Sequence, residues 1–385
     1  MTSLTHKLFK KIDGRTIELL VALGSGQVSV ALVYHNNQEK PLILQSRSRT
    51  IPFDHGPSPD ELQQNALEVL DVLLADFMKE LGGMFELNDL YDSHQTIHSV
   101  QVMLSPLWVD TQIMNYEEQF EAPTVITQEV LRSHIQEGGT ENMIDASVVF
   151  ARANQYHVHP EDIIGMETPE IELQIKKSNL SQVHRLDIES AINKHISTEK
   201  AGQITFVPSQ KVALASVSEL FGAHSEYMVL HIDGEDSHVI TRNNEEGMRF
   251  DSVAYGIAEL KRQLIKEGLA PDFVHARDLL RAYFSDMLED SFKVRVEYVL
   301  SIESQVLANL AGALITKKVP LFIIADKNSE DFFVNHVVSD LEHVSQAVVI
   351  EPEHFEDYFA VTGEYVEPSV EICSFVTYLD IVKTS

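Results

Sequence analysis

The sequence predicts an α/β protein in which one pattern of strands and helices occurs twice, with a smaller α+β segment between. Two strand hairpins carry this prediction. The first spans residues 18–34 and turns at Gly24-Ser25-Gly26. The second spans 227–241, about two hundred residues later, and turns at 233–236. Apolar residues at helical spacing follow both hairpins, so two sheets with covering helices are expected.

The first part of the chain continues the sheet and adds a helix. Polar and apolar residues alternate from 45 to 51, which predicts a third strand within 41–53. Apolar residues recur at helical spacing from 60 to 81, and Gly82-Gly83 is expected to end this helix. A fourth strand is predicted at 97–104. We assign these elements to a first subdomain, residues 1–107.

The middle of the chain has shorter elements and fewer long helices. The predicted elements are a helix at 127–137, strands at 148–158 and 171–176, a short helix at 187–195 and a strand at 203–207. This mixture predicts an inserted α+β subdomain at residues 108–208.

Residues 209–385 are expected to form the second half. The predicted elements after its hairpin are helices at 253–267, 276–289, 296–317 and 332–341, and strands at 319–325 and 347–350. The run at 319–325 is almost continuously apolar, which is typical of the centre of a sheet. Residues 370–382 fit either one or two strands or a short helix.

The charge of the chain excludes some partners. The formal net charge is −30, so nucleic acid and anionic membrane surfaces are disfavoured. Residues 328–382 contain twelve Asp or Glu and no Lys or Arg. Such a block forms either a solvated acidic face or a docking face for a basic partner, and the sequence leaves both open.

The cysteine count and the apolar runs indicate a cytoplasmic protein. Cys373 is the single cysteine of the chain, so a disulfide framework is excluded. No apolar run reaches the roughly 20 residues of a membrane span, and the N-terminus lacks the apolar core of a signal peptide. Residues 370–385 carry one basic residue, Lys383, so a direct membrane anchor is not expected.

The turns of the two hairpins are the candidate sites. A tight turn between strands presents backbone N–H groups that suit a phosphate. Magnesium-dependent phosphate chemistry also requires a carboxylate beside the turn, and Ala22 stands at the nearest position of the first hairpin. Both turns are also ordinary hairpin turns without any ligand. In the second turn, Glu235 and Asp236 would repel a phosphate unless a cation intervened.

The order of these motifs resembles the actin-like ATPase superfamily, in particular the branch of the bacterial cell-division protein FtsA and the pilus-assembly protein PilM. Val21-Ala-Leu-Gly-Ser-Gly-Gln-Val is similar to the first phosphate loop of that family, and Leu230-His-Ile-Asp-Gly-Glu-Asp-Ser is similar to the second. Asp162-Ile-Ile-Gly-Met resembles a segment of its inserted subdomain, and residues 124–137 resemble the start of that subdomain. Tyr255-Gly-Ile-Ala-Glu resembles the helix entry after the second loop.

The resemblance implies an actin-like (ribonuclease H-like) fold of two duplicated halves with phosphate loops at both turns. The candidate phosphate-binding residues are Gly24, Ser25, Gly26 and Gln27 in the first loop and Asp233, Gly234, Glu235 and Ser237 in the second. No catalytic residue is predicted. His157, His159 and Glu161 have the residue types of a zinc site, but no fourth ligand follows at a recognised spacing, so no metal site is predicted.

The sequence departs from the family at positions that the family uses for nucleotide binding and hydrolysis. Ala22 and His231 replace the Asp of the two loops, and Asp233 replaces a glycine. The stretch around Ala325-Asp326 lacks the glycines that the family places beside adenosine. The exchange to His231 removes a negative charge and would add a positive charge if the imidazole were protonated. We therefore expect a degenerate protein that has lost ATP hydrolysis and needs no cofactor, and leave nucleotide binding open.

Three functions are consistent with this resemblance. The first is a cytoplasmic scaffold of cell division or of envelope-spanning assembly, which binds protein partners through its inserted subdomain and through self-association. The second is an active ATPase that binds Mg-ATP with Asp233 or Asp236 as replacement carboxylates. The third is a pilus-assembly adaptor that holds a peptide of a membrane protein. Attachment to the inner membrane through a partner stays open in each case.

Overall fold

The computed structural model describes fifteen parts of the 385-residue chain. These are residues 15–36, 39–51, 58–87, 97–136, 141–160, 162–196, 204–222, 226–243, 247–312, 319–325, 332, 336–338, 341, 344–362 and 367–384. The chain folds into two compact units. Unit 1 combines Met1–Ser105, Val183–Ser216 and Glu351–Ser385, and unit 2 combines Pro106–Gln182 and Val217–Ile350.

Unit 1 is built on a six-stranded sheet with the order β15-β3-β2-β1-β4-β9. Its strands are β1 (Arg15–Leu23), β2 (Gln27–Asn36), β3 (Glu39–Thr50), β4 (Ser99–Leu104), β9 (Ile204–Pro208) and β15 (Ala360–Val361). β1 pairs antiparallel with β2 and parallel with β4, so its apolar residues lie in the middle of the sheet. The predicted first hairpin, third strand and fourth strand are confirmed.

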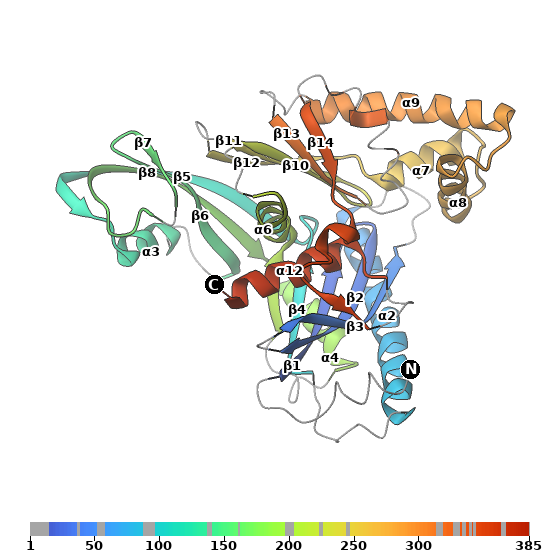
Figure 1. The fold of residues 1–385 in the computed structure, drawn as a ribbon, viewed down its shortest axis with the longest axis horizontal. Coiled ribbons are helices and arrows are strands. Elements are labelled where there is room, and N and C mark those ends of the chain that lie inside the picture. Colours follow the sequence, from blue (N-terminus) through green and yellow to red (C-terminus); the bar gives the residue numbers. More distant parts are fainter. Residues whose placement is uncertain are drawn as a thin grey trace. The chain divides into compact units, whose positions relative to one another are not determined.

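Helices cover both faces of this sheet. They are α2 (Pro59–Leu87), α4 (Gln182–Asn193), α12 (Val370–Thr384) and the first half of α6 (Ser209–Phe221), with the short 3₁₀ helix η2 (Pro352–Phe355) before β15. Successive side chains of β3 point to opposite faces of the sheet. Arg47 and Arg49 reach Glu80 and Asp76 of α2, whereas Ser48 contacts Ser29 on the face that α12 covers (Figure 1).

Two helices of unit 1, α2 and α12, can be compared with the elements predicted from the sequence. Ser58 and Glu61 exchange hydrogen bonds in a capping box, which starts α2 one residue before the predicted position. The expectation that Gly82-Gly83 ends this helix is wrong, because α2 continues to Leu87. Residues 370–382, for which strand and helix were both open, form the helix α12, and its side chains from Ile372 to Leu379 are all buried.

A buried carboxylate connects four elements of unit 1. Glu18 of β1 lies 3.1 Å from His35 Nε2 of β2 and accepts hydrogen bonds from Ser99 of β4 and Lys383 of α12, the latter at 2.8 Å. The side chain of Glu18 is 9% exposed. Burial alone would raise its pKa, but the hydrogen bonds from His35 and Lys383 outweigh burial and lower the pKa to about 2. The ionised form of Glu18 therefore stabilises the folded unit.

Unit 2 repeats the strand order of unit 1. Its five-stranded sheet has the order β12-β11-β10-β13-β14. The strands are β10 (Tyr227–Ile232), β11 (Ser237–Asn243), β12 (Gly247–Val253), β13 (Val319–Ile324) and β14 (Val344–Val349). β10 pairs antiparallel with β11 and parallel with β13, as β1 does with β2 and β4. The predicted duplication is confirmed at the level of topology.

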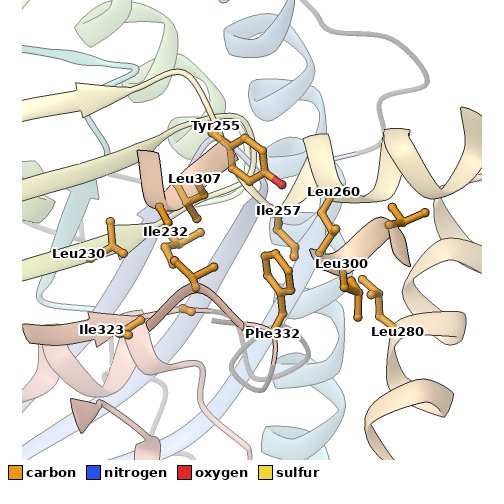
Figure 2. Close-up of a cluster of buried hydrophobic side chains, with 14 of the residues drawn as sticks. Leu230, Ile232, Tyr255, Ile257, Leu260, Leu280, Leu300, Leu307, Ile323 and Phe332 are labelled. Atoms are coloured by element: carbon orange, nitrogen blue, oxygen red, sulfur yellow. The ribbon is translucent and has the colours of Figure 1, made fainter. Parts of the chain in front are cut away.

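Three helices of unit 2 pack on one face of this sheet. They are α7 (Ile257–Lys266), α8 (Phe273–Phe284) and α9 (Asp290–Gly312). Leu230, Ile232 and Ile323 project from the strands into a buried apolar cluster. Leu260, Leu280 and Leu300 enter the cluster from the three helices, one from each (Figure 2). Burial of this cluster is the main stabilisation of the unit, because apolar surface leaves water there.

The inserted segment contributes a four-stranded sheet to unit 2, in the order β5-β8-β6-β7. Its elements are β5 (Val109–Val125), α3 (Gln128–Gln136), β6 (Met143–Ala153), β7 (Tyr156–Val158) and β8 (Glu167–Leu180). The single strand predicted at 148–158 is wrong. Asn154 and Gln155 have φ of 51° and 67° and form a turn that divides this stretch into β6 and β7.

Several other predicted elements need correction or lie outside the described residues. β5, β12 and α6 are not among the predicted elements. The helix predicted at 253–267 begins at Ile257, because residues 247–253 form β12. Half of the helix predicted at 332–341 lies outside the described residues, as do Gly138-Gly139. Residues 183–208 belong to unit 1, and the subdomain boundaries at 107/108 and 208/209 stay a prediction.

No helix in the described ranges is both long and apolar enough to cross a lipid bilayer.

We predict that Glu18→Gln destabilises the protein in a pH-dependent way. The lowered pKa means that Glu18 stabilises the fold fully above about pH 4.5 and loses this effect as the pH falls to about 2. The difference in unfolding free energy between the native chain and Glu18→Gln should be up to about 3 kcal/mol at pH 7. It should shrink as the pH is lowered to about 3, in urea unfolding followed by circular dichroism.

The matched control is Glu68→Gln on the exposed side of α2, for which we expect little change at any pH. A difference for Glu18→Gln that stays constant from pH 7 to pH 3 would contradict the assigned role.

Candidate functional site

The first candidate loop is a closed turn at the carboxyl end of β1. The Gly24 N–H donates to the Gln27 carbonyl at 3.0 Å, and the Ile51 N–H donates to the Gly26 carbonyl at 2.8 Å. Ser25 is buried within the turn. Ala22 is also buried, opposite Ser29 of β2, and provides no carboxylate beside the turn.

The first loop also has a carboxylate neighbour that sequence reasoning missed. The Gln27 side-chain amide donates to Glu371 Oε2 at 3.2 Å, and Glu371 lies in the first turn of α12. The two residues are 344 positions apart, so no local pattern could have indicated the contact. The fourth candidate residue of this loop is therefore engaged with an acidic side chain of its own chain.

The second candidate loop has the same backbone closure as the first. The Asp233 N–H donates to the Asp236 carbonyl at 3.0 Å, which matches the Gly24–Gln27 bond. Position for position, Asp233 corresponds to Gly24 and Gly234 to Ser25. The duplication thus extends from strand order to the hydrogen bond that closes each turn.

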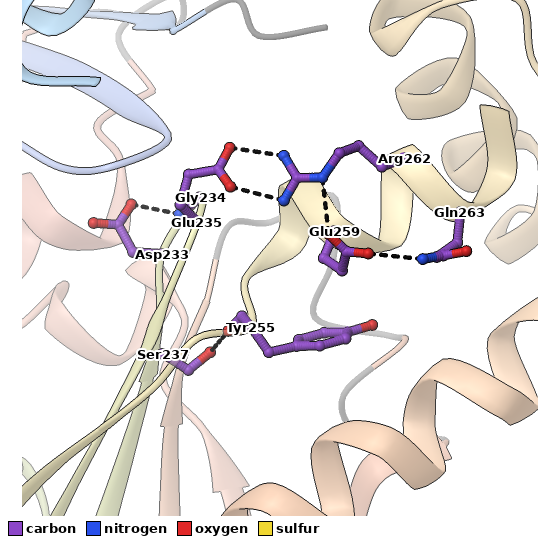
Figure 3. A network of polar contacts seen from close by, with 8 residues as sticks. All are labelled: Asp233, Gly234, Glu235, Ser237, Tyr255, Glu259, Arg262 and Gln263. Carbon is purple, nitrogen blue, oxygen red and sulfur yellow. Dashed lines mark hydrogen bonds and ion pairs between the residues drawn. The ribbon is translucent and has the colours of Figure 1, made fainter. Parts of the chain in front are cut away.

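The side chain of Asp233 uses a donor that a phosphate would need. The Gly234 N–H donates to Asp233 Oδ1 at 2.7 Å (Figure 3). Backbone N–H groups of such a turn bind a phosphate through hydrogen bonds and through their partial positive charge. The Asp233 carboxylate satisfies one of these groups and adds a negative charge beside it.

The start of α7 packs tightly against the carbonyl side of the same turn. The Ile257 and Ala258 N–H groups donate to the carbonyls of Asp233 and Gly234 at 3.1 and 2.8 Å. A Cβ on Gly256 would lie 2.2 Å from the Gly234 oxygen, so only glycine fits at this close approach. Two N–H groups at this helix N-terminus, which elsewhere attract anions, therefore hold the turn.

An arginine fixes Glu235, a second acidic side chain of the turn. Arg262 of α7 binds both carboxylate oxygens of Glu235, at 3.0 and 2.7 Å, and its Nε donates to Glu259 at 2.8 Å (Figure 3). Burial alone would lower the pKa of Arg262, but the hydrogen bonds to Glu235 and Glu259 outweigh burial and raise the pKa. Glu235 is thus held by a bidentate pair in which both side chains are mostly buried.

Ser237 and Tyr255 connect the turn to the helical layer. The Ser237 hydroxyl donates to the Tyr255 carbonyl at 2.5 Å, and the Tyr255 hydroxyl donates to Glu303 of α9 at 3.0 Å. Burial raises the pKa of both Tyr255 and Glu303, so the tyrosine keeps its proton at neutral pH. Ser237, a predicted phosphate ligand, serves in the structure as a backbone-positioning group.

His231 is buried in a way that disfavours the positive charge a protonated imidazole would add at this position. The side chain is buried on β10, opposite His238, and the ring centroids are 6.4 Å apart. Burial lowers its pKa to about 4, and His238 contributes to the decrease. Asp236, the other candidate replacement carboxylate, lies 3.1 Å from His238 Nε2. Asp233 and Asp236 therefore both have partners within the hairpin.

The predicted adenosine-side position is only partly described. Ala325 is buried at the end of β13, and Asp326 lies outside the described residues. His157 lies on β7 and His159 directly after it, while Glu161 lies outside the described residues. Within the described ranges, no group of three or more His, Cys, Asp or Glu side chains could hold a metal ion.

The inserted sheet carries a cavity that sequence reasoning missed. Its volume is about 490 Å³, and its lining is Glu117, Glu118, Gln119, Arg152, Gln155, Glu170, Ile171 and Glu172. Two of these glutamates are paired, Glu172 with Arg152 and Glu118 with His134, each at 3.0 Å. With four carboxylates and one guanidinium, the cavity suits a cationic group better than an anion. The residues come from β5, β6, β8 and the β6–β7 turn, which explains why no sequence motif marks them.

The comparisons with known proteins concern the fold. No protein-family model matches the chain, and no curated protein sequence matches it. A solved PilM-PilN type IV pilus biogenesis complex has a chain with a TM-score of 0.54 and 13% identity, over 97% of this chain and 99% of that one. The ethanolamine utilization protein EutJ from Carboxydothermus hydrogenoformans has a TM-score of 0.45 and 11% identity, over 96% and 91% of the two chains.

The repeated strand order, the two matching turns and the likeness to PilM over the whole chain define an actin-like ATPase fold. The fold class predicted from the sequence is therefore confirmed. Within this class, the chain is structurally similar to PilM, at an identity that shows the fold alone.

We predict that Gly256→Ala disrupts the second loop. The backbone of Gly256, with φ of −135° and ψ of −176°, is accessible to alanine, so the effect comes from the close contacts of the added Cβ with the Gly234 and Asp233 carbonyls. The unfolding free energy should fall by about 1–3 kcal/mol in urea unfolding. Ser252→Ala, at an exposed position of β12, is the control and should change little. Native stability of Gly256→Ala would contradict the close approach.

Proposed function

We propose that the protein is a non-catalytic actin-fold scaffold that acts through protein–protein contacts instead of ATP turnover. The observation that carries this proposal is the hydrogen bond from the Gly234 N–H to the Asp233 carboxylate. A carboxylate of the chain itself takes a donor of the phosphate loop, at a position where the related family has glycine. Its charge also opposes an incoming phosphate.

Two further features support the absence of turnover. Ala22 and the neutral His231 offer no carboxylate for Mg²⁺ at either loop, although hydrolysis of a nucleoside triphosphate depends on such a metal ligand. The carboxylates nearest to the second turn, Asp233, Glu235 and Asp236, already bind groups of their own unit. An active Mg-ATPase would have to break these contacts.

A PilM-like adaptor role is the second candidate, and the similarity to a chain of the PilM-PilN complex over nearly the whole length of both proteins favours it. In this role the protein would hold a segment of a membrane-associated assembly protein and would be peripheral to the membrane through that partner. The carboxylate-lined cavity on the inserted sheet offers a place for a basic side chain of the partner. In a cell-division role, the same cavity would bind a basic side chain of a different partner.

The direct test of the first proposal is calorimetric titration with Mg-ATP together with a phosphate-release assay. We expect no binding in the micromolar range and no phosphate release above background. Asp233→Asn and Asp236→Asn are the matched controls, because they change the two candidate replacement carboxylates. Micromolar binding with release that either variant abolishes would overturn the proposal, whereas release unchanged by both variants would indicate a contaminating enzyme.

The adaptor role is tested by affinity capture from the native host. We expect capture of pilus-assembly proteins by the native chain and its loss in a Glu117→Lys, Glu170→Lys double variant, because positive charge in the cavity would repel a basic segment. Glu68→Lys on α2 is the control and should capture normally. Recovery of division proteins instead would assign the scaffold to cell division, and capture unaffected by the double variant would exclude the cavity.

A further inference from the structure

An apolar ridge runs along the solvent side of α9. The residues Val294, Tyr298, Ile302, Val306 and Leu310 follow one another at intervals of four, and their exposed fractions are 69%, 65%, 43%, 41% and 43%. Side chains four positions apart are neighbours on a helix surface, so the five form one continuous row. The opposite side of α9, including Leu300 and Leu307, lies in the apolar core of unit 2.

The part of α9 that carries most of this ridge exposes no charge. Between Tyr298 and Leu310, the other exposed side chains of α9 are Ser301, Gln305 and Asn309. An uncharged exposed stretch of this length is unusual in a chain with a formal net charge of −30. Contiguous apolar surface on a soluble protein commonly marks an interaction site.

We infer that the ridge on α9 is the contact between two copies of this chain, related by a two-fold axis that passes near Ile302. Such an axis places Tyr298 of each copy against Val306 of the other copy. A larger side chain therefore meets a smaller one on both sides of Ile302. Rows of residues at intervals of four interdigitate between helices that cross at about −50°. The ridge is therefore complementary to itself, as a two-fold contact requires.

Charge favours a second copy as the occupant of this surface. Two chains with a net charge of −30 repel each other over most of their surfaces, and contact is least unfavourable where neither carries a charge. A strongly basic partner would gain nothing specific from an uncharged ridge.

The area of the ridge sets the strength of the contact. Its five side chains expose on the order of 500 Å² per copy, so two copies would bury roughly 1,000 Å², the lower limit for a specific interface. We therefore expect a weak dimer that forms in the micromolar range or above. The inference does not depend on the nucleotide loops and goes beyond the proposed scaffold function.

The test is sedimentation of the full chain from low to high micromolar concentration. We expect a monomer–dimer equilibrium that becomes tighter as NaCl is raised to about 0.5 M, because salt screens the repulsion between the two acidic chains. Ile302→Glu and Ile302→Lys should each weaken dimerisation by roughly tenfold or more, because each puts two like charges together at the axis.

A mixture of the two variants decides the geometry. Ile302→Glu and Ile302→Lys should form a mixed dimer at concentrations where each alone is monomeric, and this rescue also shows that both variants are folded. Val274→Glu, at an exposed valine of α8, is the control and should dimerise normally. A chain that stays monomeric at every concentration and salt, or variants that dimerise like the native chain, would overturn the inference. Failure of rescue would also overturn it if circular dichroism shows both variants to be folded.

Discussion

The structure depends on two central strands, β1 and β10, that each pair antiparallel on one side and parallel on the other. A parallel neighbour cannot follow through a tight turn, so the chain must leave the sheet and return through helices. The crossovers α2 in unit 1 and α7–α9 in unit 2 are the result. The turn after each central strand lies where the direction of strand addition reverses, which is where α/β sheets commonly place ligands. The positions of both candidate loops thus follow from topology, independently of whether they bind anything.

Local signals in the sequence were sufficient for much of this topology, but long-range pairings were not accessible. Both hairpins and the buried run of β13 have strong apolar patterns with clear turn residues, and the structure contains them. β5 has few apolar residues, because one face of this strand is largely exposed, so alternation gives only a weak signal there. In residues 148–158 the pattern was misleading instead of weak. Polar and apolar residues alternate across a two-residue turn, so two strands, β6 and β7, were predicted as one. The position of Asn154 in that turn was the available signal.

The sequence marks both turns, but most of the contacts around them were not predictable from it. The missing carboxylates at Ala22 and His231 are visible in the sequence alone. The neutrality of His231 depends on its burial and on His238, which only the packed sheet provides. Arg262 carries no sequence signal, because a single arginine on a helix usually lies in solvent; its role comes from the distance to Glu235. The side chains of the second turn therefore have structural contacts within their own unit, and these contacts are not visible in the sequence.

The contact between Glu18 and Lys383 also bears on how the chain folds. These residues are 365 positions apart, and unit 1 is assembled from three separate segments of the sequence. A contact of such high sequence separation forms late, because closing the intervening chain costs entropy before the contact stabilises anything. During synthesis, the charge of Glu18 has no cationic partner on α12 until residues beyond 380 have left the ribosome. All segments of unit 2 emerge before that point, so unit 2 is able to fold before unit 1 is complete.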